Sequence, residues 1–341
     1  MKKFWVAGAT GFLGSHLVKT LLERGHQVIA VSKSGGQVHG AEVAAVDILD
    51  ERAVADSARG ADGAFLVTGR VSRDRHDAEL LHRDNVLGTE RALKALQAAR
   101  LERVVVASTS GTLAVSRDAD SIADESCRAP LEVIARWPYY RTKLYAERVA
   151  LEANRPGVFE VVVVNPSLLL GPGDLRESST GDVRLFLERS IPATPAGGMA
   201  FVDVRDAALG MLQAFERGRA GERYLLNGKN MTIAAFFQRL ERISGVKAPV
   251  LRMPSSRPLA LGLNQVFSKA VEAIGGRAPI DEVSVEMAQY FWYCSAEKAE
   301  RELGFSARDA GETIADTIDD LVKRKVVAVS KGSHLGAFAS R

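Results

Sequence analysis

Residues 8–14 form a glycine run with the spacing G-x-x-G-x-x-G, and this run constrains the fold more than any other feature of the chain. A short, mostly apolar stretch from Lys3 to Ala7 precedes it and predicts a buried strand. After it, leucines recur every four residues up to Leu21 and predict one face of a helix that ends near Arg24. The chain therefore begins with a strand, a glycine turn and a helix.

A glycine turn in this setting can hold a dinucleotide. Gly8 permits the tight turn, Gly11 lets the backbone approach a pyrophosphate, and Gly14 lets the helix pack closely on its strand. The phosphates would then face the free N–H groups of the helix N-terminus. A glycine turn alone is a weak signal, but the strand ahead of it favours this interpretation. The cofactor-binding residues predicted here are Gly8, Thr10, Gly11, Phe12, Leu13 and Gly14.

Composition bounds the remaining possibilities. The 341 residues suffice for one large α/β domain with an appended piece, or for two domains. The formal charge is +3 with both signs interspersed, so neither nucleic acid nor an anionic membrane is an expected partner. No apolar run approaches the roughly 18 residues of a membrane helix, and the apolar stretch after Lys3 is too short for a signal peptide. The distant Cys127 and Cys294 suit a reducing, cytoplasmic compartment, and the scattered histidines give no metal site.

Strands alternate with helices through the first half of the chain. After the first strand, the predicted strands are Gln27 to Ser32, Glu42 to Val46, Gly63 to Thr68, Arg103 to Ala107 and Glu160 to Asn165. The predicted helices are Glu51 to Arg59, Asp74 to Ala99 and one that Pro138 opens, and Lys33 to Gly36 is a predicted loop. This alternation predicts an α/β fold with a Rossmann-type, doubly wound parallel sheet. Ligands bind at the carboxyl ends of such strands, where the small and polar clusters of this chain fall.

After the sixth strand the alternation breaks, and short helices mix with isolated strands. We predict a dinucleotide-binding Rossmann domain over residues 1–165 and a smaller, partly interleaved substrate-binding region over 166–322. A strand near 224–227 is expected to return to the large sheet. The segment from Arg257 to Ile274 is a candidate mobile lid, and residues 323–341 are expected to form a loosely attached tail.

Tyr139 and Lys143 are four residues apart and share one face of the helix that Pro138 opens. A neighbouring ammonium favours the phenolate, so it lowers the pKa of a phenol and suits it to acid–base work. Such a pair also arises by chance. The position of the pair between the fifth and sixth predicted strands favours a functional role over chance.

The motifs, taken together, resemble those of extended short-chain dehydrogenases/reductases, the NAD-dependent epimerase/dehydratase family. They are the glycine run, Asp47-Ile48, Asn85 to Thr89, Val104 to Thr109, the Tyr139/Lys143 pair, Asn165-Pro166-Ser167, Gly171 to Asp174, Val202 to Asp206 and Ala299 to Phe305. The resemblance covers about residues 3 to 321. Within the family the chain is most similar to the branch that holds dihydroflavonol reductases, 3β-hydroxysteroid dehydrogenases and hopanoid-associated epimerase-like proteins.

The resemblance implies roles for particular residues. Thr109, Tyr139 and Lys143 would form the catalytic trio, with Ser110 as the rival of Thr109. The further residues implied at the cofactor are Asp47, Ile48, Val67, Thr68, Gly69, Pro166 and Ser167, together with Tyr139 and Lys143. The chain departs from nucleotide-sugar enzymes at Leu113-Ala114, where they carry Tyr-Gly, and this puts sugar-nucleotide epimerisation in doubt.

The residues after the second strand bear on the choice of cofactor. An NAD-selective site places Asp or Glu at the end of this strand to hold the ribose 2′-hydroxyl. This chain has Ser32, followed by Lys33 and Ser34. An ammonium and hydroxyls can hold a 2′-phosphate, so NADP(H) is predicted, with NAD(H) as the alternative. Lys33 as a solvated turn lysine is the other interpretation.

We therefore predict an NADP(H)-dependent oxidoreductase that interconverts a ketone and a secondary alcohol on a largely apolar small molecule. Leu168 to Leu170 and Pro258 to Val266 are short of the charges that would hold a diphosphate. The alternatives are a sugar-derivative epimerase or dehydratase and a non-catalytic dinucleotide-binding sensor. The chain could form a homodimer through the Asp74 to Ala99 helix or the Tyr139 helix, but solvated helix faces would show the same sequence pattern. One basic cluster, Arg70, Arg73, Arg75 and His76, either meets an acidic substrate group or is a solvated helix start.

Overall fold

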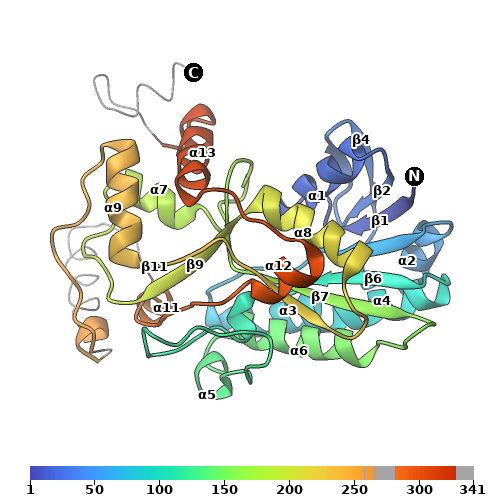
Figure 1. Cartoon of the computed structure of the whole chain (residues 1–341), viewed down its shortest axis with the longest axis horizontal. Helices are drawn as coiled ribbons and strands as arrows, with labels where there is room; N and C mark the ends of the chain where they lie inside the picture. Colours follow the sequence, from blue (N-terminus) through green and yellow to red (C-terminus); the bar gives the residue numbers. More distant parts are fainter. Residues whose placement is uncertain (257, 263–264, 266–280, 328–341) are drawn as a thin grey trace.

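The structure is a computed structural model that describes residues 1–256, 258–262, 265 and 281–327. An eight-stranded sheet has the strand order β10-β7-β6-β5-β1-β2-β4-β3 (Figure 1). Its strands are β1 (Lys3–Ala7), β2 (Gln27–Ser32), β3 (Gly36–Val38), β4 (Ala41–Ala45), β5 (Gly63–Leu66), β6 (Arg103–Ala107), β7 (Glu160–Pro166) and β10 (Arg223–Leu226). All neighbouring strands are parallel except β3 and β4. The predicted doubly wound parallel sheet is confirmed.

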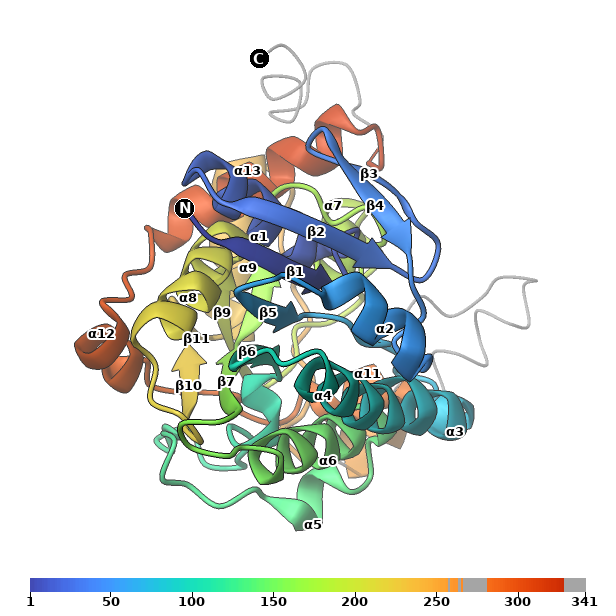
Figure 2. The ribbon, with the colours of Figure 1, turned by 90° about the vertical axis from the view of Figure 1, so that its right-hand side faces the viewer.

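The central strands are apolar on both faces because helices cover both faces of the sheet. Val104 to Val106 in β6 and Val161 to Val164 in β7 are all buried, with no alternation of polar residues. On one face lie α1 (Phe12–Glu23) and α8 (Val204–Arg217) (Figure 2). On the other lie α2 (Glu51–Ala58), α4 (Gly88–Ala98) and α6 (Pro138–Glu152). The packing of these helices fixes the strand ends at which the site is built.

Two local predictions need correction. The expected loop from Lys33 to Gly36 runs into β3, which pairs antiparallel with β4 and was too short and too exposed to be read from sequence. The expected helix from Asp74 to Ala99 is divided into the 3-10 turn η1 (Arg75–Asp77), α3 (Ala78–Leu81), a π-helical turn η2 (His82–Leu87) and α4. The π turn is the point where the Asn85 side chain reaches back to Arg70. Such turns interrupt helices frequently at functional sites.

The second half of the chain builds a smaller sheet with the order β11-β9-β8. Its strands are β8 (Leu168–Leu170), β9 (Gly198–Asp203) and β11 (Lys229–Thr232), and its apolar cluster includes α7 (Gly181–Leu187), α9 (Ile233–Ser244) and α13 (Ala310–Lys323). In the part of the chain that the structure describes, the remaining short elements are η3 (Ser110–Thr112), α5 (Leu131–Ile134), α11 (Glu282–Met287) and α12 (Glu297–Leu303). Between the small-sheet strands, β10 pairs with β7 and so returns the chain to the large sheet. The division at residues 165 and 322 stays a prediction.

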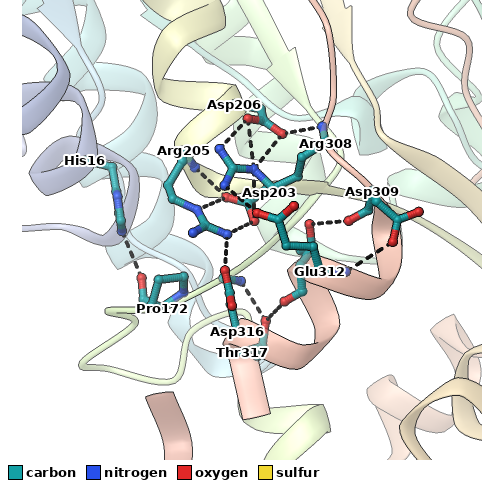
Figure 3. Close-up of polar contacts among 12 residues, drawn as sticks. His16, Pro172, Asp203, Arg205, Asp206, Arg308, Asp309, Glu312, Asp316 and Thr317 are labelled. Carbon is teal, nitrogen blue, oxygen red and sulfur yellow. Dashed lines mark hydrogen bonds and ion pairs between the residues drawn. The ribbon is translucent and has the colours of Figure 1, made fainter. Parts of the chain in front are cut away.

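Ion pairs join α13 to α8 (Figure 3). Arg205, near the start of α8, pairs with Asp203 at 2.7 Å and with Asp316 of α13 at 2.6 Å. Arg308, just ahead of α13, pairs with Asp206 of α8 at 2.8 Å. Because Asp203 and Asp206 are buried, their charges need these guanidinium partners. The network therefore joins α13 to α8, which itself packs on the large sheet.

Most of the candidate lid from Arg257 to Ile274 lies outside the described residues, as does the tail from residue 328. Among the residues that the structure describes, no helix has the length and apolar character needed to cross a membrane. In the same part of the chain, no group of three or more His, Cys, Asp or Glu side chains gathers in a way that could hold a metal ion.

Candidate active site

A cavity of about 1190 Å³ lies along the residues that directly follow the strands of the large sheet. Every predicted cofactor-binding or catalytic residue lines it, except Gly14. Ser110, the rival of Thr109, lines it as well. The fold therefore brings together side chains that are up to 159 positions apart in the sequence, from Gly8 to Ser167.

The glycine turn has the shape that a dinucleotide needs. Gly8 has φ +79°, and a Cβ there would lie 2.9 Å from the Cα of Thr68. A Cβ on Gly14 would lie 2.0 Å from the Gly8 carbonyl oxygen, so this residue supports the turn from behind without lining the cavity. Gly11 is the N-cap of α1 and supplies no side-chain cap. The first-turn amides thus face the cavity without a capping side chain, as a pyrophosphate site requires.

At one end of the cavity, Lys33 and Asp47 form an ion pair with 2.8 Å between Nζ and Oδ2. The hydrogen bond from Lys33 lowers the pKa of Asp47, and the amide of Leu49 also donates to this carboxylate. The buried Ser32 hydroxyl donates to the carbonyl oxygen of Gly35 at 3.2 Å. The residues predicted to select the cofactor are therefore already bonded within the chain, with Lys33 as the exposed member.

Asn85 positions the turn that follows β5. Its Oδ1 accepts from the amide of Arg70 at 2.7 Å, and its Nδ2 donates to the hydroxyl of Thr142 on α6 at 3.2 Å. The side chain therefore connects the segment from Val67 to Gly69 to the helix that carries Tyr139. The sequence analysis included Asn85 in a motif but predicted no role for it. The π turn that directs its side chain inward has no recognisable pattern of apolar residues in the sequence.

Tyr139 and Lys143 stand at the start of α6, whose first turn Pro138 opens. Lys143 is buried, and its Nζ donates to the Ala107 carbonyl oxygen at the end of β6, at 2.7 Å. Burial lowers the pKa of Lys143 to about 8, while the charge of Glu147 opposes this fall. Both groups thus lie where a parallel sheet binds its ligands.

The pKa of Tyr139 is raised above that of an ordinary phenol, first by burial and then by Tyr140. This is the opposite of the shift expected from the spacing of Tyr139 and Lys143. The ammonium is directed at a strand end, and desolvation of the phenolate therefore dominates. The phenol remains protonated at neutral pH.

Thr109 and Ser110 differ in what their hydroxyls already contact. Thr109 is the N-cap of η3, where its Oγ1 accepts from the Gly111 amide at 3.3 Å and keeps its own proton for donation. Ser110 is buried, and its hydroxyl bonds the side chain of Cys294. These contacts favour Thr109 over Ser110, and its catalytic role stays a prediction.

Aromatic rings form the cavity wall beside Tyr139. The ring of Tyr140 lies 5.0 Å from that of Tyr139 and 4.9 Å from that of Trp292, and Trp137 stacks on Trp292 at 5.5 Å. Gly111 makes room for this wall, since a Cβ there would lie 2.2 Å from Cε1 of Tyr140. Further apolar lining comes from Leu168, Leu169, Leu185, Met199, Phe236, Phe237, Met253 and Met287.

The three arginines of the basic cluster pair with carboxylates of the chain itself. Arg70 pairs with Asp84 at 2.8 Å. Arg73 pairs with Asp182, and Arg75 with Glu286, both at 3.0 Å. His76 is exposed and bonds Asp74 at 2.8 Å. The arginines thus tie the turn after β5 to elements of both halves of the chain, which neither interpretation of the cluster anticipated.

Comparisons with known proteins agree with this geometry. The sequence model of the NAD dependent epimerase/dehydratase family matches residues 4–227. A putative dihydroflavonol 4-reductase of Synechocystis sp. is 34% identical over 324 residues, which cover 92% of this chain and 93% of the relative. The 4-hydroxy-2-methyl-3-oxo-4-farnesyl-3,4-dihydroquinoline-1-oxide ketoreductase of Stigmatella aurantiaca is 32% identical over 321 residues, which cover 89% and 92%.

A solved structure supports the same assignment over nearly the whole length. The crystal structure of gox2253 matches with a TM-score of 0.80 at 26% identity, covering 96% of this chain and 100% of that chain. Both sequence relatives are named as reductases, which agrees with the predicted oxidoreductase and does not favour the sugar epimerase. The chain belongs to the NAD dependent epimerase/dehydratase family of extended short-chain dehydrogenases/reductases, as its motifs predicted.

Proposed function

We propose that this protein is an NADP(H)-dependent oxidoreductase that interconverts a ketone and a secondary alcohol on a largely apolar small molecule. The observation that carries the proposal is the convergence of Thr109, Tyr139 and Lys143 on the cavity that also contains the glycine turn. The reductase names of the relatives support the same reaction class. We assign cofactor binding chiefly to residues 1–165 and substrate binding chiefly to residues 166–322.

The residues present fit a dinucleotide. The uncapped first turn of α1 would hold the pyrophosphate, Asp47 and Ile48 would flank the adenine, and the segments at 67–69 and 166–167 would line the nicotinamide half. Lys143 would hold the nicotinamide ribose hydroxyls through its buried ammonium. When bound, the reduced nicotinamide would supply the hydride. Lys33, exposed at the cavity, would meet a 2′-phosphate and so favour NADPH over NADH.

Tyr139 would act as the general acid. Ketone reduction needs a proton at the substrate oxygen, and the raised pKa of Tyr139 keeps that proton available at neutral pH. Thr109 would donate a hydrogen bond to the same oxygen and hold it beside the phenol. In the reverse direction the same oxygen, as a phenolate, would accept the proton of the alcohol.

The lining of the cavity supports an apolar substrate. Aromatic and aliphatic side chains surround the region beside Tyr139, and the nearby guanidinium of Arg73 is paired with Asp182. Arg73 is therefore not free to pair with the diphosphate of a nucleotide sugar in this part of the cavity. The free cysteines Cys127 and Cys294 support the proposal of a cytoplasmic location. We also propose a homodimer through the outer faces of α3 and α6, where Leu80 and Tyr145 are exposed. The molecular mass of the protein in solution tests this.

The decisive experiment incubates the purified protein with NADPH and a panel of apolar ketones and follows the absorbance of the reduced cofactor. Consumption of NADPH with an apolar ketone supports the proposal. Inverted product stereochemistry without net cofactor change would instead indicate an epimerase. Tight binding of a nucleotide sugar, with no binding of hydrophobic ketones, would overturn the apolar substrate class.

A further inference from the structure

Glu147 continues the spacing of Tyr139 and Lys143 by one more helical turn along α6. The three residues therefore share one face of the helix, directed at the ends of the large sheet. Glu147 is buried, with 2% of its surface exposed. It does not line the cavity, so any influence on the reaction must pass through other residues.

Four polar groups from three other segments meet the Glu147 carboxylate. Its Oε2 accepts from the hydroxyl of Ser108 at 2.6 Å and from that of Thr112 at 3.0 Å. It also accepts from Nδ2 of Asn165, on β7, at 2.7 Å. Its Oε1 forms an ion pair with Arg223 of β10 at 3.0 Å. A buried carboxylate is tolerated only with such compensation, and here every partner is a donor.

Two of these partners also hold the backbone of Thr109. The hydroxyl of Thr112 has one proton, which can go either to Glu147 or to the Thr109 carbonyl oxygen 2.9 Å away. Nδ2 of Asn165 lies 3.1 Å from that oxygen and has two protons, so it can donate to Thr109 and to Glu147 together. Meanwhile Lys143 bonds the carbonyl of Ala107 at 2.7 Å. Helix α6 thus holds the segment from Ala107 to Thr112 at both ends. Lys143 contacts Ala107 at its start, and Glu147 contacts Thr112 at its end.

Glutamine in place of Glu147 would keep the size of the side chain. It would, however, bring an NH₂ group into a site whose other members are donors, and it would leave Arg223 without a carboxylate partner.

We propose that Glu147 is a positioning residue for the reaction: through Thr112 and Asn165 it fixes the segment from Ala107 to Thr112 so that the Thr109 hydroxyl meets the substrate oxygen. This inference rests on the proposed function for its catalytic part. The order that Glu147 imposes on the segment is independent of any substrate.

The first test measures amide hydrogen exchange in the purified protein without substrate. In Glu147→Gln, the peptide over residues 107–114 should exchange about tenfold faster or more, because the amides of Thr112 and Leu113 bond within this segment. Asp206→Asn is the matched control, since it also removes a buried carboxylate charge from an arginine pair, away from α6. It should leave exchange in 107–114 unchanged. Equal exchange of this peptide in wild type and Glu147→Gln overturns the proposal.

The second test is a double-mutant cycle on kcat with Thr109→Val. Glu147→Gln alone should lower kcat by about 10²-fold, the usual scale of a misplaced catalytic group. In the Thr109→Val background it should cost less than about threefold, because both changes remove the same contribution. Effects that multiply in full would overturn the proposal, since Glu147 would then act independently of Thr109.

A milder variant covers the case in which Glu147→Gln does not fold. Thr112→Val removes one hydroxyl of the same network without disturbing the ion pair with Arg223. It should show the same faster exchange in 107–114 and the same non-additivity with Thr109→Val, and absence of either effect overturns the proposal. If wild type reduces no ketone, the proposed function fails, and the exchange experiment still decides the role of Glu147 in ordering the segment.

Discussion

The ammonium of Lys33 lies 2.8 Å from the carboxylate of Asp47, which links the residue that we expect to select the cofactor to the residue that we expect to flank its adenine. Lys33 follows β2, and Asp47 follows β4, its parallel neighbour in the sheet. The Lys33 side chain is 70% exposed, and exposed ion pairs contribute at most about 1 kcal/mol. Lys33 can therefore leave Asp47 for a more highly charged phosphate at little cost.

Lys33→Ala should lower the ratio of kcat/KM for NADPH to that for NADH by about tenfold, the scale of one hydrogen bond to a charged group. Initial rates with each cofactor at a fixed ketone concentration measure it. Lys94→Ala, which removes an exposed lysine from α4, is the control and should leave the ratio unchanged. Equal kcat/KM for the two cofactors in wild type, or an unaltered ratio in Lys33→Ala, would count against NADPH selection by Lys33.

Tyr139→Phe should lower kcat by a factor on the order of 10² or more, because it removes the proton of the general acid and little else. Binding of NADPH, followed by fluorescence titration, should stay nearly intact. Tyr140→Phe is the matched control, since Tyr140 lines the same cavity and keeps its ring contact with Trp292 after the change. If Tyr140→Phe abolishes turnover and Tyr139→Phe does not, the acid is assigned to the wrong residue.

The pH dependence of reduction should follow Lys143. Its pKa is lowered by burial to about 8, against 10.5 for an unperturbed lysine. Below pH 8 the ammonium is intact in the free enzyme, so kcat/KM for NADPH should be highest there and should fall as the pH rises through about 8. The raised pKa of Tyr139 keeps the phenol protonated through the same range. The measurement is a pH profile of kcat/KM.

The lowered pKa of Lys143 also affects the stability of the fold, but stability should rise with pH where kcat/KM falls. Between about pH 8 and 10.5 the unfolded chain binds more protons at Lys143 than the folded chain, so this residue's contribution to stability rises with pH there. Lys143→Arg is the control for the predicted fall of kcat/KM near pH 8, because a guanidinium keeps its charge over the whole pH range of the profile. Residual activity of Lys143→Arg should therefore lack the fall near pH 8. Retention of that fall would assign it to another group.

Gly14→Ala should abolish dinucleotide binding or unfold the glycine turn, because the new Cβ would lie 2.0 Å from the carbonyl oxygen of Gly8 and neither backbone can yield. Isothermal calorimetry with NADPH and a thermal melt separate the two effects. Gly262→Ala is the control, since a Cβ there meets no atom of the described residues within 4 Å. Full cofactor affinity in Gly14→Ala would contradict the close packing of α1 on the turn.

The local elements of the site could be predicted from the sequence because their causes are local. The conformation at Gly8 and the spacing of Tyr139 and Lys143 depend on neighbouring residues in the chain. Apolar runs such as Val104 to Val106 indicate strands covered on both faces. The parallel sheet and the gathering of the predicted residues at the ends of its strands follow from these features, and the structure confirms the sheet and brings those residues, apart from Gly14, to one cavity.

Tertiary structure alone decided the features that depend on residues far apart in the sequence. The ion pair of Glu147 with Arg223 joins positions 76 residues apart, and the hydrogen bond from Asn165 to Thr109 joins positions 56 apart. The raised pKa of Tyr139 likewise reflects its burial in the folded chain. The prediction that Lys143 and an oxidised nicotinamide together lower this pKa stays a prediction, and within the chain itself burial raises the pKa. Desolvation depends on all the atoms that surround a group, and only the folded chain brings those atoms together.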